Sequence, residues 1–237
     1  AGSERVAIAI FAKAPVPGRV KTRLTPPLTA EEAARVASAS IEDTLRLFVP
    51  KISASWTLYL DGDPDAALRT LTRERNVAIV PQIGADLGER LDDAFRALRG
   101  NGARRVLAIG SDSPTLDPAV LRDAVSALQS CDIVLGPAED GGYYLIGMSG
   151  AHEALFVGIP WSTDAVFERT LERARELKLA VTVLPRWYDL DDLASLRRAH
   201  RERLESREGR MGGDAAPSES ALGRVLEELQ YRLGLDR

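Results

Sequence analysis

Strand-length apolar runs alternate along the chain with longer stretches in which apolar residues recur at helical spacing. The first run, at residues 5–12 (RVAIAIFA), predicts a buried strand. Thr29 then opens a helix with a capping-box pattern, and its apolar positions continue to Phe48. Further strand segments are predicted within residues 56–62, 77–82, 104–114, 131–140, 141–150 and 180–192, and further helices from Pro64, over 86–99, from Asp117 and over 164–178.

This alternation predicts an α/β fold. Strands that alternate with helices over such a length form a mostly parallel sheet covered on both faces, which gives a three-layer α/β/α, Rossmann-like arrangement with a twisted sheet. In such folds ligands bind in the crevice at the carboxyl ends of the strands. Each loop that follows a strand is therefore a candidate for ligand binding.

The composition changes near residue 205. We expect residues 1–205 to form the main domain and residues 206–237 to form a linker and a C-terminal helix. Residues 206–220 (SREGRMGGDAAPSES) are typical of a flexible linker or long loop, and residues 221–236 of a short amphipathic helix. That helix can dock on the domain or on a second subunit, so a homodimer is one expectation.

Charge and composition exclude several classes of protein. The chain has 237 residues, of which 45% are hydrophobic and 28% charged, as in ordinary globular proteins. Its formal net charge of −4 argues against a general binder of nucleic acid or of anionic membranes. No apolar run reaches the roughly 18–20 residues of a membrane span, and no signal-peptide pattern is visible. The single cysteine, Cys131, excludes an internal disulfide. We expect a cytoplasmic protein.

The loop after the first strand is unusually basic for an acidic chain. Between Arg5 and Leu28 there are five basic residues and no acidic one. Within APVPGRVKTRL (14–24), two prolines restrict the loop and Gly18 allows close approach of a ligand. Its cationic side chains suit a polyphosphate, although the loop lacks the Gly-Lys-Ser/Thr of a Walker A motif and can also be read as a solvated basic loop. These side chains are Arg19, Lys21 and Arg23.

Two further loops carry candidate chemistry. In PQIGADLGERL (81–91), Gln82 offers a donor and an acceptor to a base edge and Gly84 permits close approach, although the stretch also fits a plain helix start. In GSDSP (110–114), Asp112 follows the most apolar strand and suits a hard cation bound to phosphate oxygens. The alternative for Asp112 is a helix or turn cap before Pro114.

Two acidic segments lie further along the chain. EDGGYYLIG (139–147) contains the Asp-Gly signal of a tight hairpin, and it could also bind a polyhydroxylated or acidic acceptor. In WYDLDDL (187–193), Asp192 fits the N-terminal turn of a following helix. Asp189 and Asp191 alternate at strand spacing and share a face, so one of them could join Asp112 at a metal ion.

Together these segments resemble the GT-A, nucleotide-diphospho-sugar transferase superfamily, and within it a family of small bacterial glycosyltransferases or nucleotidyltransferases. The chain is more distantly similar to the guanylyltransferases of molybdenum-cofactor and 2-phospho-L-lactate metabolism. The resemblance covers residues 5 to about 203. The opening loop lacks the full GxGxR pattern of sugar pyrophosphorylases, and GSDSP has one aspartate where many glycosyltransferases have Asp-x-Asp.

The resemblance implies roles for individual residues. It implies Mg²⁺ or Mn²⁺ on Asp112 together with Asp189 or Asp191, and catalytic roles for Arg19, Lys21 and Asp112. The implied nucleotide-binding residues are Ala12, Pro17, Gly18, Arg19, Lys21, Arg23, Gln82, Gly84 and Ser111. The implied residues for a small-molecule acceptor are Glu139, Asp140, Gly141, Gly142, Tyr143, Trp161 and Ser162, the last two from a family motif at residues 160–163.

Three functions are compatible with this site. Nucleotidyl transfer joins a nucleoside triphosphate to a phosphorylated acceptor and releases pyrophosphate, whereas glycosyl transfer uses a nucleotide sugar. The three basic residues of one loop favour the more highly charged triphosphate. The third reading is a non-catalytic nucleotide-binding module. Hydrolases that use histidine or zinc are disfavoured, because His152 and His200 are the only histidines and are expected on surface helices.

Overall fold

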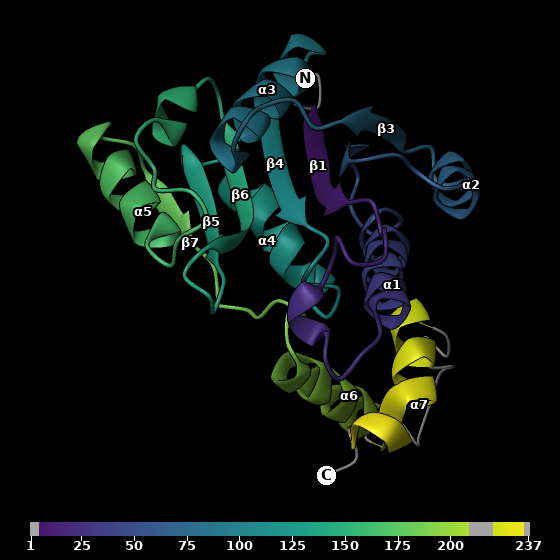
Figure 1. Ribbon diagram of the computed structural model, residues 1–237. Helices are drawn as coiled ribbons and strands as arrows, with labels where there is room; N and C mark the ends of the chain where they lie inside the picture. The colour runs from purple at the N-terminus through teal and green to yellow at the C-terminus, as the bar shows by residue number, and fades with distance from the viewer. Residues whose placement is uncertain (1–4, 209–219, 235–237) are drawn as a thin grey trace.

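The structure, a computed structural model, describes residues 5–208 and 220–234. Within these residues one sheet contains seven strands, β1 (Val6–Lys13), β2 (Ser55–Asp61), β3 (Ala78–Pro81), β4 (Arg105–Gly110), β5 (Ile133–Pro137), β6 (Tyr143–Ser149) and β7 (Val181–Val183). Their order is β3-β2-β1-β4-β6-β5-β7 (Figure 1). Only β6 runs antiparallel to its neighbours among these strands, so the predicted mostly parallel sheet is confirmed.

Helices cover both faces of the sheet. They are α1 (Ala30–Phe48), α2 (Ala66–Glu74), α3 (Leu87–Gly100), α4 (Pro118–Ala127), α5 (Val166–Glu176), α6 (Leu193–Glu208) and α7 (Ala221–Leu233), with short 3-10 helices η1 (Thr22–Leu24) and η2 (Glu153–Phe156). Ile8 and Ile10 of β1 pack with α1, α2 and α4, whereas Ala7 and Ala9 pack with α3 and α5. The predicted three layers are confirmed. None of the helices described is long and apolar enough to cross a membrane.

Local sequence signals set most of the element boundaries. The capping box at the start of α1 is confirmed: the Glu32 amide donates to the Thr29 hydroxyl at 3.2 Å, and the Thr29 amide donates to the Glu32 carboxylate at 2.8 Å. The segment 180–192 departs from the prediction, because β7 ends at Val183. Beyond β7 the chain keeps the bond from the Leu184 amide to Leu135 O at 2.8 Å and an isolated bridge between Ala138 and Trp187.

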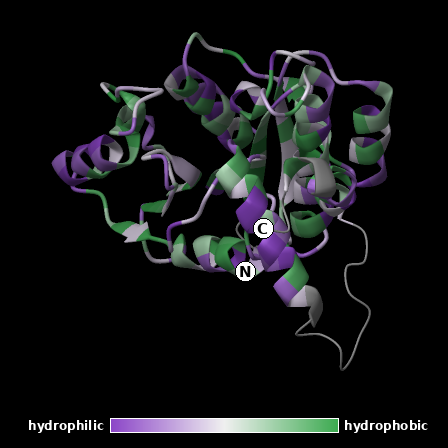
Figure 2. Cartoon of the chain, turned by 60° about the horizontal axis from the view of Figure 1, so that its bottom comes forward, coloured by the Kyte–Doolittle hydropathy of each residue, from purple (hydrophilic) through white to green (hydrophobic). Residues whose placement is uncertain are grey.

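The C-terminal helix packs on its own chain. α7 lies along α1 and α6, where Leu222, Leu226 and Leu229 join a buried apolar cluster (Figure 1). Figure 2 brings this end of the molecule forward, where green hydrophobic and purple hydrophilic segments are mixed. Helix α6 continues past residue 205 to Glu208, and residues 209–219 of the predicted linker lie outside the described residues.

Asp43 of α1 is hydrogen-bonded to the start of α7. Its buried carboxylate accepts the backbone amides of Ala221 at 2.7 Å and Leu222 at 3.0 Å, and burial raises its pKa. Replacing Asp43 with Ala should lower the free energy of unfolding by about 2 kcal/mol, since two amides lose a charged acceptor. Chemical denaturation measures this effect, with Asp123→Ala on the exposed face of α4 as the control. Equal stability of both variants would contradict it.

Candidate functional site

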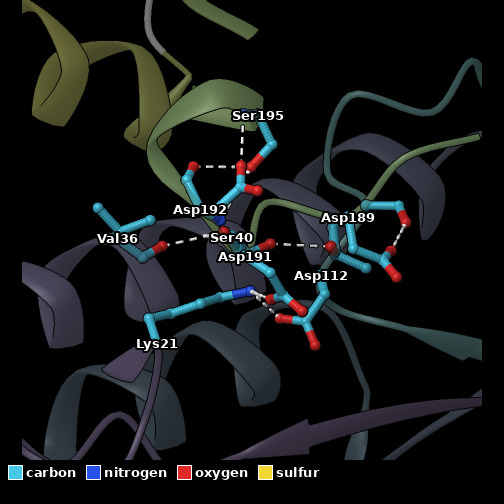
Figure 3. Close-up of polar contacts among 10 residues, drawn as sticks. Lys21, Val36, Ser40, Asp112, Asp189, Asp191, Asp192 and Ser195 are labelled. Carbon is cyan, nitrogen blue, oxygen red and sulfur yellow. Dashed lines mark hydrogen bonds and ion pairs between the residues drawn. The ribbon is translucent and has the colours of Figure 1, made fainter. Parts of the chain in front are cut away.

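Loops from three distant parts of the chain meet at the carboxyl end of the sheet. The Ser111 amide donates to Phe11 O at 3.1 Å, which joins the ends of β4 and β1. The Leu190 amide donates to Asp112 O at 2.8 Å and ties in the segment before α6. These backbone contacts bring together Asp112, Asp189 and Asp191, with Lys21 from the basic loop (Figure 3).

Lys21 lies between two of these carboxylates. Its ammonium group bonds to Asp112 and, at 2.9 Å, to Asp191, and its side chain is only 5% exposed. Burial lowers the Lys21 pKa, but the charges of Asp112 and Asp191 outweigh this and the pKa is raised. The Lys21 backbone is left-handed at φ 49° and starts η1, which turns its side chain toward the aspartates.

Asp189 faces a different partner. Its carboxylate accepts the Ser113 hydroxyl at 2.5 Å. Burial is the main cause that raises its pKa to about 6, and the charges of Asp112, Asp191 and Asp140 add to the rise while the bond from Ser113 opposes it. Asp112 and Asp191 thus share one cation, and Asp189 lies beside them.

The carboxylates fit a hard divalent ion. Oxygens of Asp112 and Asp191 already converge on a cationic group, the Lys21 ammonium, and Mg²⁺ commonly binds through one or two carboxylates plus water and phosphate. Across the described residues no three His, Cys, Asp or Glu side chains are grouped as a metal site, so such an ion would need ligands from the substrate or water.

The raised pKa of Asp189 predicts a pH-dependent stability. An unfolded aspartate titrates near pH 4, so between about pH 4 and 6 the folded protein binds more protons and its free energy of unfolding falls as pH rises. Asp189→Asn should flatten this slope and, without divalent ions, stabilise the protein at pH 7 by on the order of 2 kcal/mol. Denaturation between pH 4 and 7 tests this, with Asp123→Asn as the control. An unchanged slope would contradict it.

The basic loop presents Arg19 outward. Pro17 and Gly18 (φ 77°) form a turn closed by the Arg19 amide on Val16 O at 3.0 Å, the Pro-Gly pattern of a type II turn. A Cβ at Gly18 would meet no atom within 4 Å, so glycine serves the turn rather than close packing. Neither Arg19 nor Arg23 has an ion pair or hydrogen bond from its side chain within the described residues, whereas Lys21 is bonded to two carboxylates.

Gln82 is occupied by protein partners. Its Nε2 donates to Ala12 O and Tyr59 O, each at 2.9 Å, and its Oε1 accepts from Arg90 at 3.0 Å. It therefore joins the ends of β1 and β2, and its predicted contact with a base would require these bonds to change.

Gly84 has φ 140°, and a Cβ there would lie 2.7 Å from the Arg90 amide. Ser111 is buried.

The predicted acceptor residues divide into two groups. Glu139 and Asp140 line a cleft of about 340 Å³ beside the aspartates. Gly141 instead packs against the backbone of Asp164, where a Cβ would lie 2.0 Å from Asp164 O. Tyr143 packs edge-on against Trp161 with ring centroids 6.4 Å apart, and the Trp161 indole covers Gly88. Outside the lining of that cleft lie Gly141, Gly142, Tyr143, Trp161 and the exposed Ser162.

The cleft also contains residues to which the sequence analysis assigned no role. Tyr188, Ser195 and Arg198 line it together with Arg23. Ser195 and Arg198 are three residues apart on α6, so the helix that Asp192 predicts could have indicated them as one face. His200 is buried in α6, which corrects its expected surface position, because it lies on the same face of the helix as the buried Leu196 and Ala199.

Comparison with known proteins places the chain in a family. Residues 44–163 match a family described as uncharacterized proteins conserved in bacteria (DUF2064). The chain belongs to this family. The DUF2064 match includes Asp112, Glu139 and Trp161 but neither the basic loop nor α6. A comparison with curated proteins gives no match.

Solved structures extend the DUF2064 result. A crystal structure from Desulfovibrio desulfuricans G20, provisionally described as a nucleotide-diphospho-sugar transferase, shares 30% identity over 98% of both chains at a TM-score of 0.84. A cytidylyltransferase from Leptospira borgpetersenii has a TM-score of 0.54, with 11% identity and coverage of 98% and 97%. Glucosyl-3-phosphoglycerate synthase from Mycobacterium tuberculosis has a TM-score of 0.51 and 13% identity, with coverage of 98% of this chain and 81% of the synthase. The cytidylyltransferase and the synthase show that this chain shares their fold. Together with the structure from Desulfovibrio desulfuricans, they confirm the predicted GT-A resemblance.

Proposed function

We propose that this protein is a metal-dependent nucleotidyltransferase. It would transfer a nucleoside monophosphate from a nucleoside triphosphate to a phosphorylated small molecule and release pyrophosphate. The observation that carries this proposal is the meeting of the basic loop with Asp112 and Asp191 at one end of the sheet, where Lys21 bonds to both carboxylates. A polyphosphate bridged to a divalent ion needs this combination of charges.

The chain's own residues would chiefly bind and orient the substrates. Asp112 and Asp191 would hold Mg²⁺ or Mn²⁺, because they share a cation here whereas Asp189 is bonded to Ser113. The bound ion would supply Lewis-acid stabilisation of the phosphate charge. Arg19 has no side-chain partner within the described residues and would bind the outer phosphates, joined by Lys21.

The reaction would be an in-line displacement at the α-phosphorus. An acceptor phosphate oxygen would form the new P–O bond as the bond to pyrophosphate breaks. Arg19 and Lys21 would neutralise the charge that develops on the leaving group. Positioning and charge neutralisation account for catalysis of this type, since little covalent chemistry is required from the protein.

Glycosyl transfer is the second candidate. Its support is that glucosyl-3-phosphoglycerate synthase, whose structure contains Mn²⁺ and UDP, shares the fold. A nucleoside diphosphate would then be the leaving group at the same carboxylates and basic loop.

The test is a pyrophosphate assay. The protein is incubated with Mg²⁺, each nucleoside triphosphate and a panel of phosphorylated acceptors, and we expect pyrophosphate release that depends on both substrates and stops with chelator. Consumption of UDP- or GDP-sugars without pyrophosphate would establish the glycosyl reaction instead. Tight nucleotide binding that is insensitive to chelator, with no product, would indicate a non-catalytic module.

A further inference from the structure

Two arginines from opposite ends of the chain line the cleft beside the aspartates. Arg23 comes from η1 and Arg198 from α6. We infer that Arg23 and Arg198 bind an oxyanion of the acceptor, a phosphate or carboxylate, with Glu139 occupying that position until the acceptor arrives. The inference rests on the proposed function, since it names the acceptor class of the same site. It also moves Arg23 from the nucleotide side to the acceptor side.

The carboxylates of the cleft each accept a hydrogen bond from another group of the chain. Four of its aspartates are bonded within the chain, as follows: Asp192 to the Ser195 amide, Asp140 to the Gly142 amide, Asp189 to the Ser113 hydroxyl and Asp191 to Lys21. Arg23 lines the same cleft, is exposed, and has no side-chain partner in the part of the chain that the structure describes. Among the charged side chains that line this cleft, Arg23 is therefore the one with no side-chain partner in the described part of the chain.

Tyr188 and Glu202 hold Arg198 in a fixed orientation. Its Nε donates to Glu202 at 2.9 Å, and its guanidinium lies over the Tyr188 ring, 3.9 Å from the centroid. Tyr188 is itself bonded to Glu202 at 2.7 Å. These contacts hold the guanidinium independently of Glu139, and such a preorganised group suits the binding of a planar or tetrahedral oxyanion.

Glu139 occupies the cleft side of Arg198. Its carboxylate accepts from Nη1 at 2.8 Å, and its side chain is 52% exposed. An exposed ion pair of this kind contributes little to stability, so a ligand oxyanion can replace it at low cost. A ligand that also reaches Arg23 would gain a second charge-assisted contact. A neutral sugar acceptor would need neither arginine.

Titration with simple oxyanions tests the inference. Inorganic phosphate and, separately, acetate are titrated into the full-length ¹⁵N-labelled protein, and arginine Nε–H signals report binding. We expect saturable binding that weakens about tenfold in Arg198→Gln and in Arg23→Gln. Glu139→Gln should tighten it, because the competing carboxylate loses its charge. The more tightly bound anion identifies the acceptor group as phosphate or carboxylate.

Controls separate this inference from folding and from the proposed function. Arg73→Gln, exposed on α2, should bind phosphate like the wild type, and Arg198→Lys should recover part of the affinity lost in Arg198→Gln. Unchanged affinity in Arg198→Gln, weaker binding in Glu139→Gln, or no saturable binding of either anion would overturn the acceptor assignment. Nucleotide binding with Mn²⁺ is measured on the same samples, and its absence in the wild type would overturn the proposed function alone.

Discussion

Asp112→Asn should lower kcat/KM for nucleotidyl transfer by at least about a hundredfold. Asp112 presents a half-exposed carboxylate at the point where the basic loop and the segment before α6 meet, and it shares the Lys21 ammonium with Asp191. The amide of asparagine has nearly the same shape but no charge, so it should bind a divalent ion and the attached phosphates far less well. The pyrophosphate assay gives kcat/KM, and calorimetry with Mn²⁺ gives the metal affinity.

The fold should tolerate this substitution. Asp112 is tied to the segment before α6 through its backbone carbonyl, which accepts the Leu190 amide and is unchanged in asparagine. We therefore expect cooperative unfolding near the wild-type temperature, with Asp123→Asn, an exposed aspartate on α4, as the matched control. Full activity of Asp112→Asn would refute the assignment of Asp112 as a metal ligand.

The sequence predicted the elements more completely than the site. The apolar run of β1 and the Thr29 capping box are local signals, so both could be identified without tertiary information. The same is true of Asp192, whose carboxylate caps the start of α6. Each of these features depends on residues within a few positions of one another.

The direction of Lys21 could not be predicted in this way. Its partners Asp112 and Asp191 are 91 and 170 residues away in the sequence. Its left-handed backbone is also unusual for a residue other than glycine and has no local sequence signal here. Composition alone grouped Lys21 with Arg19 and Arg23 as one basic patch, whereas the fold turns it inward and leaves the two arginines exposed.

Gln82 and Trp161 show the same limit. The amide of Gln82 suggests a contact with a base, and the family resemblance implies a contact of Trp161 with the acceptor, but in the structure each has a packing role. Gln82 ties strand ends together, and Trp161 covers Gly88 at the start of α3. A side chain's chemistry indicates what it can bind, and only tertiary contacts show whether its polar atoms are available.

Lys21→Met should have opposite effects on metal affinity and on turnover. Without its ammonium, Asp112 and Asp191 repel each other at one end of the sheet, so a divalent ion should bind more tightly than in the wild type when no nucleotide is present. With nucleotide present, the phosphates lose a charged donor, and kcat/KM should fall by at least about a hundredfold. Mn²⁺ titration by calorimetry and the pyrophosphate assay measure the two effects.

The thermal stability of this variant gives an independent readout. Without divalent ions, two carboxylates lose their shared counter-charge and the Tm should fall, whereas Mn²⁺ should restore it in proportion to its affinity. Lys13→Met, at the exposed end of β1, is the matched control and should change neither property. Weaker Mn²⁺ binding in Lys21→Met would show that Lys21 supports the metal site instead of competing for it, because removal of a competing cation can only strengthen binding at the same carboxylates.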